Sequence, residues 1–240
     1  DDRVIRAFNN VRFYKSDMSG KCDSLHSSTK NELTQLIGKP ILWNNENQMT
    51  GNVMHLIGNN ETEKLDSLKV LNNAFIIQKD SLSKNGFNQM KGQNLFGRFE
   101  ENKLKEVDII KNAESIYYIY NDKNEFVGIR KSVCSRINLE MNENKIETMT
   151  GFNNTESNIY PDNEFPENAR KLRGFAWRGD ERILSKENIF PEEELAIDAK
   201  VQIDAQKKAI ESDKPMEIQK ETLEYDEKNP KPKDKTVKKL

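Results

Sequence analysis

KLDSLKVLNNA, the sequence of residues 64–74, returns as KLKEVDIIKNA at residues 103–113 and as KIETMTGFNNT at residues 145–155. Each copy opens on lysine and a large apolar residue and closes on asparagine and a small residue. The apolar anchors of these copies and of a looser first one are separated by 32, 39 and 42 residues: Leu33, Leu65, Leu104 and Ile146. Self-similarity at such a spacing is typical of stacked structural units. We therefore expect function to reside in a surface that all units share.

The repeated units are predicted to be β-strands. Apolar and polar positions alternate within residues 95–99 and within residues 137–141, and alternation with period 2 is the signature of a strand with one buried face. Short turns rich in Asn, Asp and Gly separate these stretches, as at residues 58–60, 100–102 and 142–144, which predicts hairpins. The sequence therefore favours an all-β, antiparallel, repeat-built fold.

The chain is predicted to contain three parts. Residues 1–162 form the β-repeat domain, residues 163–190 an irregular capping segment, and residues 191–240 a charged tail that is helical over about 192–210 or disordered. The capping segment carries three apolar side chains that we expect to close the last repeat: Leu172, Phe175 and Trp177. Because residues 5–11 repeat the closing half of a unit, we expect a longer protein with a further repeat and a signal peptide upstream.

Composition argues against several classes of function. The net charge of −2 comes from 38 basic and 40 acidic residues without a basic stripe, so no nucleic-acid partner is predicted. Neither His26 nor His55 has the spacing of a metal ligand, no catalytic motif occurs, and no cofactor is expected. Cys22 and Cys134 lie in different repeats, several strand spacings apart, and are expected to be free thiols.

The aligned repeats share one apolar column, which is the candidate site. The simplest interpretation is a closed core in which these side chains pack only against one another. The alternative is a groove, because small residues such as Ala74, Gly97 and Ala113 recur where a dense core would hold larger ones. Such a groove would bind acyl chains at about 0.8 kcal/mol per buried methylene. The predicted groove residues are Val11, Phe13, Leu42, Ala74, Ile76, Leu95, Phe99, Ile109, Ala113, Ile137, Leu139 and Met141.

Three stretches carry a resemblance to a known family. They are NQMKG at residues 88–92, NNVRFY at 9–14 and LRGFAWR at 172–178, and together with the repeats they resemble the OstA-like proteins of Bacteroidetes. That family is similar to the periplasmic LptA-type lipopolysaccharide transporters, and the resemblance extends over about residues 4–182. It implies a folded-over β-jellyroll, or β-taco, without catalytic residues. Its apolar groove would carry lipid A acyl chains, and its edges would pair with similar Lpt-type sheets in the periplasm.

Three functional hypotheses remain after this comparison. The first is a non-enzymatic periplasmic carrier, associated with the outer membrane, that shields lipopolysaccharide acyl chains during export. The second is a β-solenoid interaction scaffold with a closed core that binds an outer-membrane protein complex. The third, a polysaccharide hydrolase, requires a carboxylate pair on one exposed face.

Overall fold

The computed structural model describes residues 2–44, 46–142, 145–190 and 200–204. The chain divides into two compact units, Asp1–Phe190 and Pro191–Leu240. In the second unit the described residues 200–204 are helical, and the remainder of the helix predicted over 192–210 lies outside the described residues. The described segments include no helix with the length and hydropathy needed to cross a bilayer.

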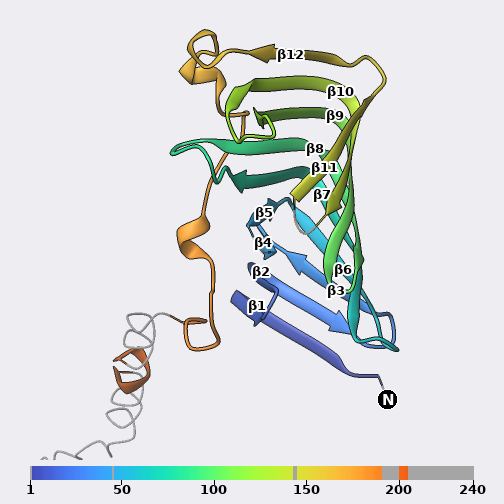
Figure 1. The fold of residues 1–240 in the computed structure, drawn as a ribbon. Helices are drawn as coiled ribbons and strands as arrows, with labels where there is room; N and C mark the ends of the chain where they lie inside the picture. The colour runs from blue at the N-terminus through green and yellow to red at the C-terminus, as the bar shows by residue number, and fades with distance from the viewer. Residues whose placement is uncertain (1, 45, 143–144, 191–199, 205–240) are drawn as a thin grey trace, which may run out of the picture. The chain divides into compact units, whose positions relative to one another are not determined.

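The first unit is built from antiparallel β-strands, which confirms the predicted all-β class (Figure 1). All strand pairings among its described residues are antiparallel. The strands are β1 (Val4–Lys15), β2 (Met18–Ser28), β3 (Leu33–Ile37), β4 (Ile41–Asn44), β5 (Asn47–Thr50), β6 (Val53–Asn59), β7 (Lys64–Lys79), β8 (Phe87–Glu100), β9 (Lys103–Tyr120), β10 (Phe126–Asn142), β11 (Lys145–Phe152) and β12 (Glu156–Tyr160).

The strands form a stack of rungs that follow one another in chain order. β3 and β4 together make one rung beside β2, β5 and β6 make the next, and β11 and β12 both pair with β10 at the far end. Counted this way, the described residues form nine rungs, and a spacing of about 4.8 Å makes the stack roughly 38 Å long. Two consecutive rungs make one hairpin, and one hairpin corresponds to one sequence repeat.

Each repeated phrase ends where its rung bends sharply. Asn72 and Asn73 have φ angles of 58° and 57°, and Lys111 and Asn112 have φ angles of 64° and 53°. The strand register shifts across each pair, so that two residues oppose one on the neighbouring strand, as in a β-bulge. Asparagine tolerates this left-handed conformation because its short side chain bonds locally. The end of the repeated phrase therefore marks a corner at which the sheet folds over.

The corner divides the sheet into two halves that face each other. We call one the covered half-sheet; it consists of β4, β5, β12 and residues 11–15, 18–21, 74–79, 87–91, 113–120 and 126–133. The other is the exposed half-sheet, which consists of β3, β6, β11 and residues 4–8, 24–28, 64–71, 94–100, 103–110 and 136–142. Side chains from both halves meet in one apolar cluster, so the interior of the fold lies between them.

A strap formed by residues 161–190 crosses the outer side of the covered half-sheet. It contains three short 3-10 helices, η1 (Asp162–Glu164), η2 (Glu167–Ala169) and η3 (Gly179–Glu181). In Figure 1 it runs across the rungs from β12 toward β1. Near β1, the side chain of Arg12 donates a hydrogen bond of 2.9 Å to the carbonyl of Ile189. The covered half-sheet is therefore enclosed on both faces.

Candidate functional site

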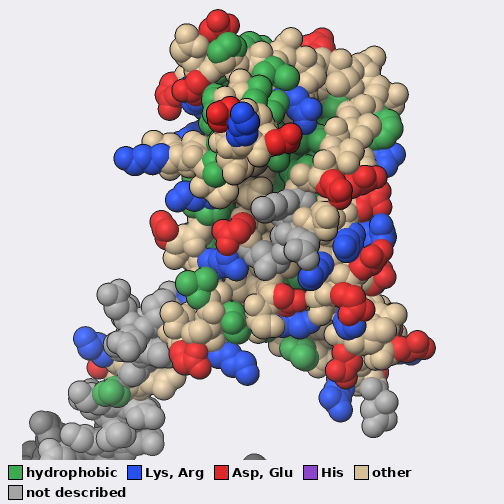
Figure 2. All heavy atoms as spheres, viewed as in Figure 1, with side chains coloured by type: hydrophobic (Ala, Val, Ile, Leu, Met, Phe, Trp, Pro, Cys, Tyr) green, Lys and Arg blue, Asp and Glu red, His purple; other side chains and the backbone are tan. Residues whose placement is uncertain are grey.

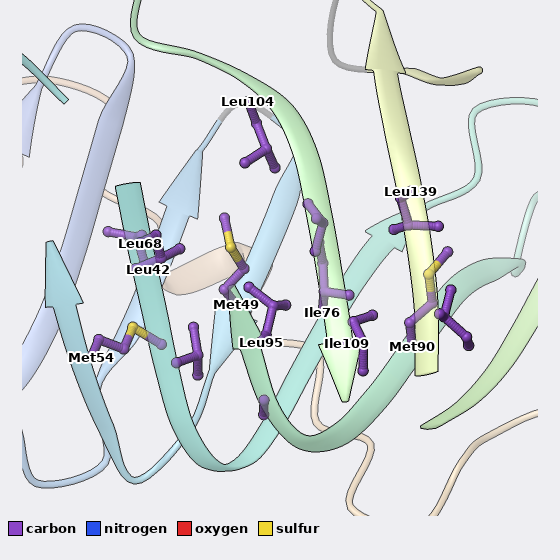
Figure 3. Close-up of a cluster of buried hydrophobic side chains, with 14 of the residues drawn as sticks. Leu42, Met49, Met54, Leu68, Ile76, Met90, Leu95, Leu104, Ile109 and Leu139 are labelled. Atoms are coloured by element: carbon purple, nitrogen blue, oxygen red, sulfur yellow. The ribbon is translucent and has the colours of Figure 1, made fainter. Parts of the chain in front are cut away.

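The apolar interior between the half-sheets brings together all twelve residues of the predicted groove. Ten of them are buried members of one cluster, and Val11 and Phe13 pack against it. We call this set of side chains the inner cluster. Its other buried members are Cys22, Leu36, Met49, Met54, Leu56, Leu68, Val70, Met90, Leu104, Val107 and Cys134. Figure 3 draws side chains from both halves in one cluster, including Leu42 and Ile76 of the covered half-sheet and Leu95 and Ile109 of the exposed half-sheet.

The middle of the inner cluster is closed to solvent. Leu42 and Ile109 are 0% exposed, and Ala74 is 1% exposed. Close packing of this kind excludes water and leaves aliphatic carbon as the main surface available to a guest. The charged side chain that is buried among the described residues, Asp80, contacts Tyr120, which is not part of this cluster. The interior is therefore better suited to a hydrocarbon ligand than to a polar or charged one.

We expected the small residues of the aligned repeats to leave empty space, and at Gly97 this expectation is wrong. A Cβ atom added to Gly97 would lie 3.0 Å from Cδ1 of Leu104 and 3.7 Å from the Leu68 side chain. The Leu104 side chain therefore already occupies the space beside Gly97 and would have to shift to admit a Cβ atom. Gly92 is similar, since a Cβ atom would lie 2.6 Å from the Ile109 side chain. The small residues permit close approach of the strands.

Burial changes the chemistry of ionisable groups at the interior. Desolvation raises the pKa of the Cys22 thiol to about 11, and it also raises the pKa values of Cys134 and Tyr117. Both cysteines are buried and free, and they belong to the inner cluster. At neutral pH they remain protonated and act as small apolar side chains.

Two glutamines of the repeat attach the strap to the covered half-sheet. Gln89 donates from Nε2 to the carbonyl of Arg170 at 2.7 Å and accepts at Oε1 from the N–H of Leu172 at 2.9 Å. Gln48 makes the same pair of bonds, to the carbonyl of Ala176 and from the N–H of Arg178, both at 2.7 Å. Each glutamine thus pairs with strap backbone as a neighbouring strand would.

The apolar side chains of the strap lie elsewhere than expected from the sequence. Phe175 and Trp177 contact the Phe87 ring, with centroids 5.2 and 5.4 Å apart, and Leu172 lies where Gln89 binds the strap. These contacts are to β8, in the middle of the stack, so the three residues do not close the last repeat. The reason is that the outer face of the covered half-sheet is itself apolar, and the strap buries it in a second cluster.

The outer face of the exposed half-sheet is polar by contrast. Arg98 pairs with Glu106 at 3.3 Å, and Arg136 pairs with Asp108 at 2.7 Å. On the face of the molecule shown in Figure 2, acidic and basic side chains are intermixed. His26 lies in β2 and His55 in β6, and within the described ranges no group of His, Cys, Asp and Glu is arranged to hold a metal ion.

Comparison with known proteins finds a likeness to solved structures alone. No protein-family model matches the chain, and no curated protein matches it. Among solved structures, the chain is similar to LptH of Pseudomonas aeruginosa, described as the LptA-homologous periplasmic component of the lipopolysaccharide transport device. The identity is 14% and the TM-score 0.45, and the match covers 61% of this chain and 100% of LptH. We therefore describe the architecture of this chain from its own strand pairing.

Sequence reasoning missed the two kinds of polar residue that shape the site. The Asn-Asn pairs at the corner and the glutamines that hold the strap both recur at fixed positions of the repeat. The signal that could have identified them in the sequence is an amide side chain that recurs at one position of otherwise apolar strands. Its partners are in the strap, more than 80 residues away, and no local pattern points to them.

Proposed function

We propose that this chain is a non-enzymatic periplasmic carrier that shields the acyl chains of lipopolysaccharide between its two half-sheets. The observation that supports this most directly is the inner cluster, which runs along the whole stack and has no charged member. The sequence resemblance to OstA-like proteins supports the same proposal. We also retain the division into a repeat domain (1–162), a capping segment (163–190) and a tail (191–240) as a proposal.

Acyl chains would occupy this interior by separating the half-sheets. Each methylene that leaves water contributes about 0.8 kcal/mol, so a chain can replace the side-chain contacts that it interrupts. The strap holds the covered half-sheet through Gln48 and Gln89, whereas the outer face of the exposed half-sheet carries solvent-facing ion pairs. The exposed half-sheet is therefore the part that moves, with the corner as its hinge.

The two ends of the stack would join similar sheets edge to edge. Within the described residues, β1 pairs only with β2, and β11 and β12 pair only with β10. An unpaired strand edge is a template for backbone pairing with another chain. β1 also presents Ile5 and Phe8, which are 61% and 68% exposed. Lpt-type β-jellyrolls of the inner and outer membrane are the partners that this geometry suits.

Site-specific photo-crosslinking tests the carrier function. A photoreactive residue at Ile76 or Leu139, which belong to the inner cluster, is expected to capture lipopolysaccharide in cells. The same residue at Arg98, whose side chain is 54% exposed on the outer face, is the matched control and should capture none. Capture at Arg98 without capture at the two interior positions would contradict the proposal.

A closed-core scaffold is the second candidate, and the complete burial of Leu36 and Leu42 favours it. Delipidated protein separates the two functions. A closed core would leave a fluorescent acyl probe in water, whereas a carrier would bind it and raise its emission.

A further inference from the structure

The open side of the folded sheet, opposite the corner, is filled unevenly along the stack. At the tips of the exposed half-sheet the register shifts once where β6 pairs with β7, β8 with β9, and β10 with β11, and an equivalent residue follows each shift. The equivalent pairs are Gly58 with Leu65, Phe99 with Leu104, and Met141 with Ile146. Large side chains therefore close the interior in the later hairpins, and glycine stands at that position in the earlier one.

Neither backbone conformation nor packing explains a glycine at position 58. Gly58 does not have a positive φ angle. A Cβ atom added there would meet only the carbonyl oxygens of Lys64 at 3.6 Å and Glu32 at 3.9 Å, which are ordinary contacts. Its counterparts Phe99 and Met141 are only 4% and 5% exposed. Gly58 thus leaves unfilled a volume that the other hairpins occupy.

A pocket of about 420 Å³ lies at this position, within the range of about 300–1,000 Å³ typical of small-molecule sites. Its inner wall includes Met18, Leu56 and Leu65, which belong to or pack against the inner cluster. The pocket therefore borders the apolar interior. Its rim carries charges of both signs from Lys15, Lys64, Glu32 and Glu63, so it does not favour an anionic or a cationic head group.

Two of the rungs beside the pocket are interrupted at the corner. β7, β8, β9 and β10 run through the corner without a break over 14 to 18 residues. The rungs formed by β3 with β4 and by β5 with β6 are interrupted there, after Ile37 and after Thr50. β3 and β6 therefore end at the corner and are held to β2 and β7 by strand pairing.

We propose that the Gly58 pocket is a lateral port through which the end of a single acyl chain reaches the inner cluster while its head group stays in solvent. This inference rests on the proposed carrier function and gives it a specific point of access. The port suits one aliphatic chain, since Met18, Leu56 and Leu65 form an apolar part of its wall and the charges at its rim balance.

The test fills the port with the residue that the next hairpin carries. The full chain, delipidated, is mixed with cis-parinaric acid, a fluorescent long-chain fatty acid, and uptake is followed by emission. Gly58→Phe is expected to weaken or slow uptake by at least about tenfold, the effect of a blocked apolar pocket. Gly58→Ala, which adds only the Cβ atom, is the matched control and should remain close to wild type.

A second measurement separates a blocked port from a damaged interior. Wild type and Gly58→Phe are refolded in the presence of the probe, so that loading does not need the port. Both are then expected to retain it, and the variant should release it more slowly. Gly58→Met, with the side chain found at position 141, repeats the test if phenylalanine lowers the thermal midpoint.

The outcomes distinguish the two proposals. Equal uptake by wild type and Gly58→Phe would overturn the port and leave the carrier function intact. Failure of wild type to bind the probe by mixing and by refolding would overturn the carrier function, and the port with it.

Discussion

Gln89 and Leu172 lie 83 residues apart in the chain and are joined by a hydrogen bond of 2.9 Å from the Leu172 N–H to the Gln89 side-chain carbonyl. Leu172 is 5% exposed, so its N–H has little access to water. A second bond from Gln89 to Arg170 completes a strand-like pairing between side chain and backbone. The strap is thus held by amides of the repeat as well as by its own apolar residues.

Gln89→Ala is expected to lower the free energy of unfolding by about 1–3 kcal/mol, because it leaves the buried Leu172 N–H without its acceptor. Urea denaturation measures the loss, and hydrogen exchange at Leu172 should accelerate. Gln93→Ala, at an exposed position of the same strand region, is the control. Unchanged exchange at Leu172 would mean that the strap is held by its apolar contacts alone.

Asn112→Val is expected to destabilise the fold by about 1–2 kcal/mol, because a β-branched side chain is strained in the left-handed backbone region. The φ angle of Asn112 is 53°. Asn112→Gly should be close to neutral, since glycine adopts this conformation freely. Equal stability of the two variants, measured by denaturation, would show that the corner adjusts without a left-handed residue.

The two thiols are expected to resist modification in the folded protein. Burial raises the pKa of Cys22 to about 11 and raises that of Cys134, so little thiolate forms at about pH 8. A thiol reagent such as DTNB should react slowly with native protein and rapidly with both cysteines in denaturant. Fast reaction under native conditions would indicate that the half-sheets separate often without lipid.

Glu181 is expected to contribute to the free energy of unfolding in a way that depends on pH in the acid range. Hydrogen bonds from Arg178, at 2.6 and 2.7 Å, are the main reason that its pKa falls from the usual 4.5 to about 2, and Lys21 at 3.1 Å adds to the effect. A carboxylate with a lowered pKa stabilises the folded state above its unfolded pKa, and this contribution disappears as pH falls toward the folded pKa.

The expected result is a difference in unfolding free energy between wild type and Glu181→Gln that is constant above about pH 5 and shrinks between pH 4.5 and 2. The difference is small, because the Glu181 side chain is 42% exposed and solvent screens the pairs. Asp180→Asn, the exposed neighbour, serves as control. A difference that grows as pH falls would contradict this assignment.

Much of the fold could be predicted from local pattern. Alternation in residues 95–99 and 137–141 predicted strands, and Leu95, Ile137 and Leu139 do lie in the inner cluster. Alternation determines which side chains share a face, and an apolar face must be buried, so these assignments need no knowledge of distant contacts. Whether these side chains contact lipid stays a prediction.

Other features of the site depend on contacts between distant segments. The repeat by itself showed that Asn-Asn pairs recur at residues 72–73 and 153–154, but their role as a corner appears only when the neighbouring strand is in register. The strap could not be placed from the sequence, because its partners Gln48 and Gln89 are more than 80 residues away.

The sequence by itself determined the strand class, the repeat and the apolar face, because these follow from side-chain periodicity within a few residues. The tertiary structure decided which small residues leave space. Gly97 and Gly58 are both glycines in strands. The side chains of Leu104 and Leu68 occupy the space beside Gly97, whereas a pocket lies beside Gly58. The difference depends on which side chains of other strands reach each position, and only the packed arrangement of those strands determines that.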